Sequence, residues 1–186
     1  LHSSHTCNLQ VIPCTGYTHA TRYELPVPPS PNLKSILSVY AYPSLCFFEG
    51  TPVSVGRGTD FPFEVFGHPS FQSMTDTFTP HAKPGAMHPP LLQQRCYGKH
   101  LQETDLFSIK NRGQLNLSWL LEAYAQNKML QDSFFTAFFD QLAGNHILKE
   151  QIRKGLSEKA IRDSWQPSLL AFKKIRRSYL LYEDFE

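Results

Sequence analysis

The sequence predicts an α+β fold, in which a small mixed sheet with proline-rich loops is followed by a C-terminal helical cluster. The distribution of proline and of acidic residues indicates this division. Thirteen of the 14 prolines lie before residue 91, where only five of the 16 acidic residues lie. In the second half, apolar residues recur at helical spacing. The chain has 186 residues, of which 41% are hydrophobic, so it is long enough to bury a sizeable core.

One helix is expected in the first half, after a proline-rich segment. Residues 25–32, "LPVPPSPN", are expected to form extended, polyproline-like backbone. Ser30 is expected to cap a helix that begins at Pro31, and Pro43 is expected to end it. Four apolar residues have the spacing of one buried helix face: Leu33, Ile36, Leu37 and Tyr40.

Short apolar runs predict the strands of the sheet. Residues 45–48 are apolar on both faces, which predicts a strand buried on both sides. The segments "FEVFG" and "DTFTP" predict two more strands between proline-rich loops. Near the start, Leu9 and Val11 alternate with other residues as in a strand, and its neighbour is not evident in the sequence. We therefore expect the chain to be the C-terminal part of a longer protein.

Five helices are expected in the second half. The first follows Asn116, the second is stopped by Gly144 and the third by Gly155. Ser157 is expected to cap the fourth helix, and Pro167 is expected to open the fifth. Because their aromatic residues fall at helical spacing, these side chains are expected to pack in a core rather than to form a platform for sugars.

Composition and charge argue against several classes of protein. The formal net charge of +2 gives no electrostatic reason to expect nucleic acid, and the basic run "FKKIRR" fits a solvated helix face. No stretch approaches the ~20 apolar residues of a membrane span. The cysteines are scattered, which favours free buried thiols over a disulfide framework: Cys7, Cys14, Cys46 and Cys96. The histidine pairs lack supporting carboxylates, so neither a metal ion nor another cofactor is expected.

One loop is a candidate functional site. Residues 49–59, "EGTPVSVGRGT", contain three glycines, which allow unusual backbone conformations and the close approach of a ligand. Arg57 carries five donors in a rigid fork that suits a carboxylate or phosphate, and Glu49 begins the loop at the edge of the core. The glycines do not form a nucleotide-binding fingerprint. Two interpretations stay open: a loop that binds anions or sugars, and an ion pair between Glu49 and Arg57 that only fastens the loop.

This loop and several other segments resemble one family. In order, "PPSPN", "YPSLCFFEGTPVSVGRGTDFPFEVFGHPSF", "KNRG", "FFDQLAGN", "IRDSWQP" and "YLLYEDF" are similar to the NamZ-type exo-β-N-acetylmuramidases, long catalogued as a domain of unknown function. The resemblance runs from "VIPC" to "YEDFE", and E-G-T-x-x-S-x-G-R-G-T is its most specific motif. Position 52 is Pro where many relatives have Asn. The resemblance implies that residues 1–24 end an N-terminal Rossmann-like domain, mostly outside this chain, and that residues 25–186 form the C-terminal α+β domain.

The resemblance also implies a function and a set of site residues. Members of the family act in bacterial cell wall turnover and release N-acetylmuramic acid from the non-reducing ends of peptidoglycan fragments. Glycoside hydrolysis needs an acid and a carboxylate base or nucleophile, so Glu49 is the expected catalytic residue. Arg57 is expected to bind the lactyl carboxylate of the sugar. Further substrate contacts are expected from loop hydroxyls and from three residues outside the loop: Thr51, Ser54, Thr59, Ser30, Asn32 and His68.

Other functions stay open beside the muramidase. One alternative is a carbohydrate-binding or assembly domain without chemistry of its own, and another is a structural protein in which the loop is a tight connection. The remaining catalytic groups are expected in the missing domain, so this chain alone is expected to be inactive. Elimination instead of hydrolysis also stays open. The substrate that the resemblance implies leads us to expect the protein in the periplasm or outside the cell.

Overall fold

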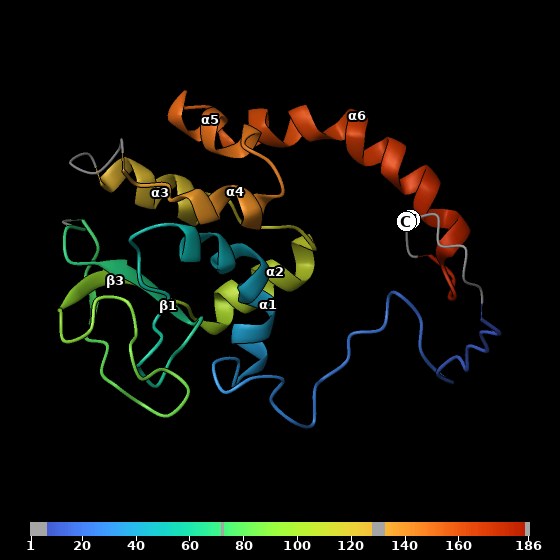
Figure 1. Ribbon diagram of the computed structural model, residues 1–186, viewed down its shortest axis with the longest axis horizontal. Coiled ribbons are helices and arrows are strands. Elements are labelled where there is room, and N and C mark those ends of the chain that lie inside the picture. The colour runs from blue at the N-terminus through green and yellow to red at the C-terminus, as the bar shows by residue number, and fades with distance from the viewer. Residues whose placement is uncertain (1–6, 72, 128–132, 185–186) are drawn as a thin grey trace. The chain divides into compact units, whose positions relative to one another are not determined.

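The computed structural model describes residues 7–71, 73–127 and 133–184. They belong to two compact units, one formed by residues 24–164 and the other by the two ends of the chain. Figure 1 shows the elements, which are, in order, α1 (Ile36–Leu45), η1 (Cys46–Gly50), β1 (Val65–His68), β2 (Asp76–Phe78), β3 (Cys96–His100), α2 (Glu103–Arg112), α3 (Ser118–Gln126), α4 (Ala137–Ala143), α5 (Ile147–Arg153), α6 (Glu158–Arg176) and η3 (Arg177–Tyr179). None of the described helices has the length and apolar character needed to cross a bilayer.

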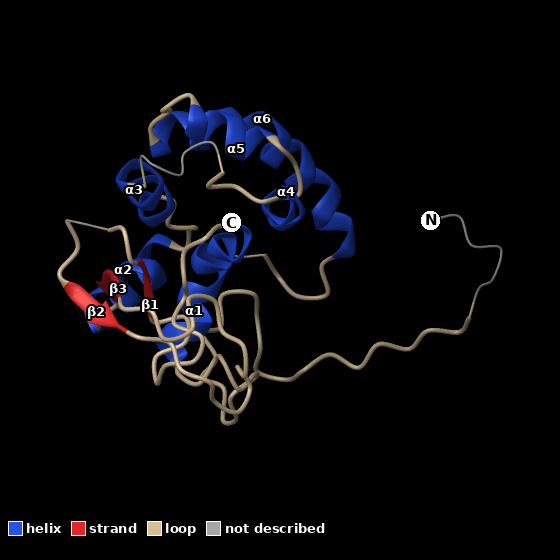
Figure 2. Cartoon of the chain, turned by 60° about the vertical axis from the view of Figure 1, so that its left-hand side comes forward, coloured by secondary structure: helices blue, strands red, loops and turns tan. Residues whose placement is uncertain are grey.

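The sheet of the larger unit is small and antiparallel. Its strands lie in the order β1-β3-β2, and Figure 2 shows them among long loops. The α+β class is thus confirmed, but the pairing is antiparallel throughout these three strands rather than mixed. Gly67 pairs with Gly98, and a Cβ on either glycine would collide with the backbone of the facing strand. Strands at 65–68 and 76–78 agree with the prediction, whereas β3 was not predicted because "CYGKH" lacks a β-branched or apolar run.

Helix α1 differs from the prediction at both ends and in its buried face. Its cap is Ser35, whose Oγ accepts a hydrogen bond from Ser38 N at 3.0 Å, so Ser30 is not the cap. Pro43 lies inside the helix and does not end it. The buried positions are mostly small and differ from the predicted apolar face: Ser38, Ala41, Ser44 and Leu45. Small side chains allow a helix to approach its neighbour closely, and α1 contacts α2.

The predicted strand at residues 45–48 is a helical segment instead. Leu45 ends α1, and η1 continues the chain as a 3-10 helix from Cys46 to Gly50. Leu45, Phe47 and Phe48 are nevertheless buried as expected. Phe48 is fully buried and stacks on Phe66 with 5.0 Å between ring centroids. Burial of each such ring stabilises the fold by about 1.5–3 kcal/mol. The period of a short apolar run does not distinguish a buried strand from a buried helix.

The aromatic core joins the sheet to the helices. Phe66 of β1 contacts Trp119 of α3 at 6.1 Å between centroids, and Phe47 of η1 contacts Phe139 of α4 at 6.0 Å. Thr136, the cap residue of α4, donates from its backbone N to Gly50 O at 2.9 Å. The end of η1 is therefore held against the start of α4.

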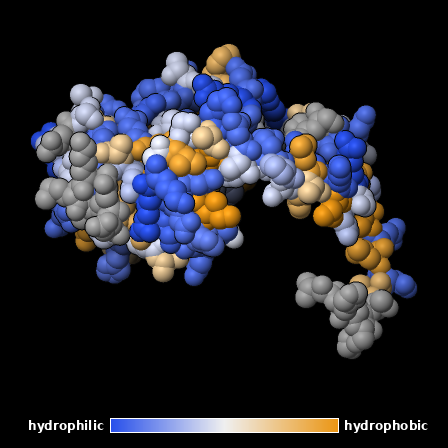
Figure 3. Space-filling view, turned by 90° about the horizontal axis from the view of Figure 1, so that it is seen from above, coloured by the Kyte–Doolittle hydropathy of each residue, from blue (hydrophilic) through white to orange (hydrophobic). Residues whose placement is uncertain are grey.

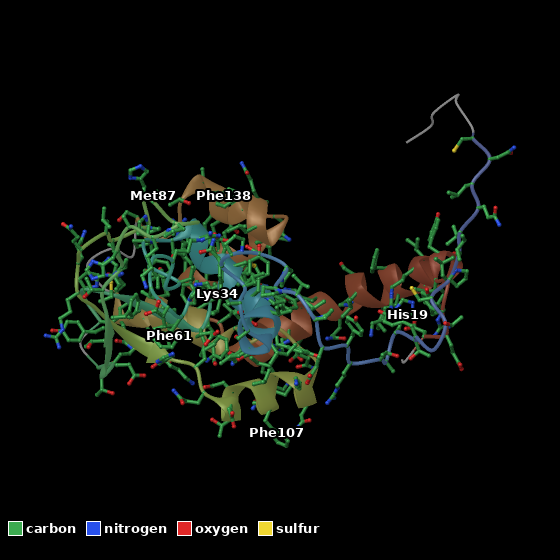
Figure 4. All side chains as sticks on the ribbon, turned by 90° about the horizontal axis from the view of Figure 1, so that it is seen from below. His19, Lys34, Phe61, Met87, Phe107 and Phe138 are labelled. Carbon is green, nitrogen blue, oxygen red and sulfur yellow. The ribbon has the colours of Figure 1, made fainter. Side chains whose placement is uncertain are left out.

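The helices of the second half agree with the prediction only in part. Gly144 and Gly155 have φ of 75° and 70° and follow α4 and α5, as predicted. Ser157 Oγ accepts from Ala160 N at 3.2 Å and so caps α6 as predicted. Pro167, however, lies inside α6, so the two predicted last helices are one. Helix α2 was not predicted, and its Phe107 is 69% exposed and points away from the neighbouring elements (Figure 4).

Several aromatic residues do not lie where their spacing placed them. Phe134 and Phe135 are buried but precede α4, which begins at Ala137. Phe138 is 47% exposed and Phe172 is 58% exposed, so the predicted core packing is wrong for these two side chains. Helix α6 instead carries several exposed apolar residues: Leu169, Leu170, Phe172 and Ile175. Figure 3 shows hydrophobic groups, in orange, at several places on the surface.

The smaller unit joins the two ends of the chain. Cys14 N donates to Tyr182 Oη at 2.7 Å, and Tyr17 meets the ring of Tyr182 edge-on at 5.1 Å. Residues 7–14 form no strand in the described structure, and Leu9 and Val11 are 81% and 47% exposed. The strand predicted there is therefore not formed in this chain.

Candidate functional site

The candidate loop begins where η1 ends and then runs beside β1. Ser54 and Gly67 exchange two backbone hydrogen bonds of 2.9 Å, which form an antiparallel bridge between the loop and the strand. Glu49 is the fourth residue of η1, and Arg57 lies in the turn between Gly56 and Gly58. The helical segment η1 thus fixes the start of the loop, and the bridge to β1 fixes its middle.

Glu49 and Arg57 form an ion pair at the surface. Arg57 Nη2 donates to Glu49 Oε1 at 2.6 Å, and the two side chains are 31% and 24% exposed for Arg57 and Glu49. The guanidinium also lies over the Phe63 ring, with 5.0 Å from Cζ to the ring centroid. Phe63 is buried and has φ of 58°, a conformation that a bulky residue adopts only where the surrounding structure enforces it. The Phe63 ring thus supports the Arg57 guanidinium, while both side chains of the ion pair remain partly exposed to solvent.

Tyr42 and Cys46 belong to the same site, although the sequence did not single them out. Burial raises the pKa of Tyr42, and the negative charge of Glu49 raises it further. Burial raises the pKa of Cys46 as well, again with a contribution from Glu49. The Tyr42 ring meets the Phe63 ring edge-on, with 5.0 Å between centroids. Two weak acids in their protonated forms thus lie near the Glu49 carboxylate. Tyr42 and Cys46 lie seven and three residues before Glu49, a spacing that places side chains on one face of a helix. The sequence did not indicate this, because Pro43 was expected to end the helix.

The three loop hydroxyls bond to backbone atoms within the loop or directly before it. Thr51 Oγ1 donates to Phe48 O at 2.8 Å, and Thr59 Oγ1 donates to Gly56 O at 2.7 Å. Ser54 is fully buried, and its Oγ accepts from Gly56 N at 3.2 Å. These contacts hold the loop in shape. The roles of the three residues in binding substrate stay predictions.

The loop glycines are required by close packing within the chain. Gly56 and Gly58 have φ of 76° and 82°, as the unusual backbone expected of them requires. A Cβ on Gly50 would lie 2.5 Å from Phe139 Cα, and one on Gly58 would collide with His81 O. The space beside these two glycines is filled by the protein itself. Close approach by a ligand is therefore not what these two positions provide.

The predicted site residues outside the loop form two separate groups. Asn32 N donates to Ser30 Oγ at 3.2 Å, and Asn32 Nδ2 donates to Gly85 O at 3.2 Å. In the described structure neither residue has a hydrogen bond to residues 49–59. His68, by contrast, follows Gly67 and so lies beside the bridge that holds the loop. Its Nδ1 lies 2.8 Å from Ser70 Oγ, and burial lowers its pKa.

The cysteines are free as predicted, but only Cys96 of the four is buried. Cys7 and Cys14 are exposed, Cys46 is half-buried and Cys96 is buried. Burial raises the pKa of Cys96 to about 11, which makes it a poor nucleophile at neutral pH. Among the described residues, no group of three or more metal-binding side chains comes together.

The fold belongs to a known structural class. A crystal structure of a DUF1343 family protein from Bacteroides fragilis NCTC 9343 superposes with a TM-score of 0.91 at 45% sequence identity, and the match covers 96% of this chain and 50% of that one. A second DUF1343 family protein from the same organism gives a TM-score of 0.62 at 17% identity over 84% of this chain and 45% of that one, and it supports the fold alone.

The sequence comparison then identifies the family. A family model described as the C-terminal part of the exo-β-N-acetylmuramidase NamZ matches residues 40–182, so the chain belongs to this family. The peptidoglycan β-N-acetylmuramidase NamZ of Bacillus subtilis (strain 168) is 32% identical over 167 residues, which are 83% of this chain and 40% of that protein. The resemblance seen in the sequence is thereby confirmed. The chain spans half or less of the length of these three relatives.

Proposed function

We propose that this domain contributes to an exo-acting β-N-acetylmuramidase that removes N-acetylmuramic acid from the non-reducing ends of peptidoglycan fragments. Support comes from the family and from the activity in the name of the Bacillus subtilis relative. The observation that carries the proposal is the partly exposed Glu49–Arg57 pair on the family's most specific motif. It combines a carboxylate for proton transfer with a guanidinium for an anionic sugar.

The ion pair gives the two residues linked roles. N-acetylmuramic acid carries a lactyl carboxylate, and a guanidinium binds such a group through two parallel hydrogen bonds. Arg57 offers one of its donors to Glu49 at 2.6 Å and has others to offer. A substrate carboxylate that engages Arg57 competes with Glu49 for its charge. The Glu49 carboxyl is thereby released from the guanidinium and can act as the acid that protonates the glycosidic oxygen.

A second carboxylate completes the reaction. Hydrolysis with retention places the two carboxyl groups about 5–5.5 Å apart, and inversion about 6.5–9.5 Å apart. We assign the second group to a part of the protein that this chain does not span, since the chain covers 40% of its Bacillus subtilis relative. The chain alone then binds the sugar weakly and turns it over slowly or not at all.

Site-directed variants of the full-length protein test the proposal with a chromogenic N-acetylmuramide. Glu49→Gln is expected to lower kcat by about 10²–10⁴, the usual contribution of general acid–base catalysis. Glu103→Gln is the matched control, because Glu103 is exposed in the first turn of α2. If Glu49→Gln retains the kcat of the wild type, the carboxylate is structural and the proposal fails.

A second comparison tests the role of Arg57. Arg57→Ala is expected to raise KM for the muramide about 10–100-fold, because hydrogen bonds to charged groups contribute about 1.5–3 kcal/mol. The same variant should act on an analogue without the lactyl group nearly as the wild type does. Arg112→Ala, at an exposed position of α2, is the control. An equal loss on both substrates would contradict recognition of the lactyl carboxylate.

A non-catalytic carbohydrate-binding or assembly domain is the second candidate function. The inward hydrogen bonds of Thr51, Ser54 and Thr59 favour the assembly role over sugar binding, because they engage hydroxyls that a sugar site would direct at its ligand. Mixing this chain with the separately produced remainder of the protein discriminates between the two functions. Activity restored by wild-type chain and by the Glu49→Gln chain alike would support assembly, whereas restoration by the wild type alone supports catalysis.

A further inference from the structure

The Phe63 ring supports two side chains of the candidate site. The Arg57 guanidinium lies over this ring, with 5.0 Å from Cζ to the ring centroid. Tyr42 of α1 meets the same ring edge-on, also with 5.0 Å between centroids. Because both side chains contact one ring, a ligand of the size of a monosaccharide can reach both of them. The structure thus brings a residue of α1 to the loop that carries the ion pair.

The backbone of Phe63 is held in an unfavourable conformation. Its φ is 58°, which costs a residue other than glycine about 1–3 kcal/mol. Its backbone N donates to Val55 O at 2.8 Å and the residue is 1% exposed, so a backbone bond and the core hold it in place. Residues in such conformations cluster at active sites and ligand-binding sites. The support shared by Arg57 and Tyr42 is therefore itself an indication of a functional site.

Both supported side chains have hydrogen-bond donors left for a ligand. Within the described residues, the Tyr42 hydroxyl has no hydrogen bond, and this tyrosine is 38% exposed. Arg57 donates from Nη2 to Glu49, and its other nitrogens make no hydrogen bond to a described residue. The thiol of Cys46, by contrast, already donates to Pro43 O at 3.4 Å. Donors thus exceed acceptors here, which favours a ligand that brings acceptors, above all an anion.

The Tyr42 hydroxyl lies beside the ion pair and keeps its hydrogen. Burial raises the pKa of Tyr42, the negative charge of Glu49 raises it further, and the positive charge of Arg57 lowers it. Both charges therefore act on the phenol oxygen, as they do only over a short distance. Because the ordinary pKa of tyrosine is already about 10, the phenol is protonated at neutral pH. Tyr42 thus offers a neutral donor next to the cationic donors of Arg57.

We propose that Tyr42 is a substrate-binding residue whose hydroxyl donates to the same carboxylate that Arg57 binds. The inference rests on the proposed function and adds a second anchor for the lactyl group of the sugar. A carboxylate has about four lone-pair sites, so it can accept from a guanidinium and a phenol together. Hydrogen bonds to an ionised acceptor are about twice as strong as those between neutral groups. Tyr42 therefore adds to the selection of sugars that carry a carboxylate.

Binding to the full-length protein tests this assignment with two sugars. N-acetylmuramic acid carries the lactyl carboxylate, and N-acetylglucosamine has a hydroxyl in its place. Tyr42→Phe keeps the ring that contacts Phe63 and removes only the hydroxyl. It is expected to raise the Kd for N-acetylmuramic acid about 10–100-fold and to leave the Kd for N-acetylglucosamine unchanged. A Kd for N-acetylmuramic acid equal to that of the wild type would overturn the proposal.

Tyr40→Phe is the matched control variant. Tyr40 lies two positions earlier in α1, and its ring contacts Lys110 Nζ at 5.1 Å from the centroid instead of Phe63. This variant is expected to bind both sugars as the wild type does. The Kd values are compared at a temperature at which thermal unfolding shows every variant to be folded, so that loss of the fold cannot imitate loss of the contact.

Carbon NMR of the protein labelled at tyrosine Cζ reads the contact directly. The Tyr42 resonance is identified by its loss in Tyr42→Phe. It is expected to shift when N-acetylmuramic acid is added and to stay unchanged with N-acetylglucosamine, whereas the Tyr40 resonance stays unchanged with both. A shift of equal size with both sugars would overturn the assignment to the carboxylate. A tyrosine that only supports the fold would show no shift with either.

The outcomes separate this inference from the proposed function. If Arg57→Ala loses affinity for N-acetylmuramic acid and Tyr42→Phe does not, Tyr42 is not a second anchor and the proposed function stands. If neither variant alters binding and full-length Glu49→Gln is as active as the wild type, the proposed function fails and this inference fails with it. Loss of affinity in both variants, together with the selective shift of the Tyr42 resonance, supports both.

Discussion

Removing the Glu49–Arg57 ion pair tests whether the pair serves mainly the stability of the fold or mainly the proposed activity. The two side chains are 24% and 31% exposed, so water screens their attraction. Ion pairs at protein surfaces contribute about 0.2–1 kcal/mol, and the short contact of 2.6 Å places this pair at the upper end. Loss of about 1 kcal/mol lowers the Tm of a domain of this size by about 2–4 °C. The protein is therefore expected to stay folded without the pair.

A double-mutant cycle measures this coupling directly. Glu49→Gln, Arg57→Ala and the double variant are unfolded in urea, and the cycle removes the loss of the Phe63 contact that Arg57→Ala also causes. We expect a coupling free energy of about 1 kcal/mol or less together with a loss of activity of about 10² or more. A coupling of about 3 kcal/mol or more, with activity lost only in proportion to unfolding, would show that the pair is a structural staple.

Three further predictions concern the same loop and its neighbours. Gly58→Ala and Gly113→Ala both place alanine at positive φ, which costs about 1–2 kcal/mol, but only at Gly58 does the new Cβ meet other atoms. Denaturant unfolding should therefore show the larger loss for Gly58→Ala, and equal losses would contradict the packing argument. The raised pKa of Tyr42 should fall in Glu49→Gln, as read by ultraviolet titration against a Tyr42→Phe reference. The pKa of His68 lies below 6.5 in the folded protein, so the unfolded chain binds more protons beneath pH 6.5. Stability should accordingly fall as the pH drops below 6.5, and His68→Gln should lessen that fall.

Local chemical signals in the sequence predicted parts of the fold well. Glycines with positive φ stop α4 and α5, and the hydroxyl of Ser157 caps α6, because these effects depend on a few adjacent residues. Proline was the misleading signal. Pro43 and Pro167 both lie inside helices and end neither of them. Burial of 45–48 was predictable from its composition, but its conformation was not.

Only the part of the candidate site that lies within the 49–59 motif could be predicted from the sequence. Glu49 and Arg57 lie eight residues apart, and the sequence already placed them as partners or as neighbours in one site. Tyr42 could not be found in this way, since it lies before the motif and reaches it through the packing of aromatic rings. The direction of the threonine hydroxyls could not be predicted either. Whether Thr51 and Thr59 donate to the backbone or to a ligand depends on the local geometry, which the sequence does not give.

The unexpected helical path from α1 into η1 supports the role proposed for Glu49. Along a helix, residues separated by three or four positions lie on one face, so Tyr42, Cys46 and Glu49 are brought together. In a strand, alternation would have placed Cys46 and Glu49 on opposite faces. The far end of this path is fixed as well, since Gly50 O accepts hydrogen bonds from both the backbone N and Oγ1 of Thr136. If a ligand has to order a flexible loop, each residue that becomes ordered costs about 1–2 kcal/mol of backbone conformational entropy. In the proposed function, Glu49 has a backbone that is ordered before a sugar binds, so more of the binding free energy would be left for stabilising the transition state.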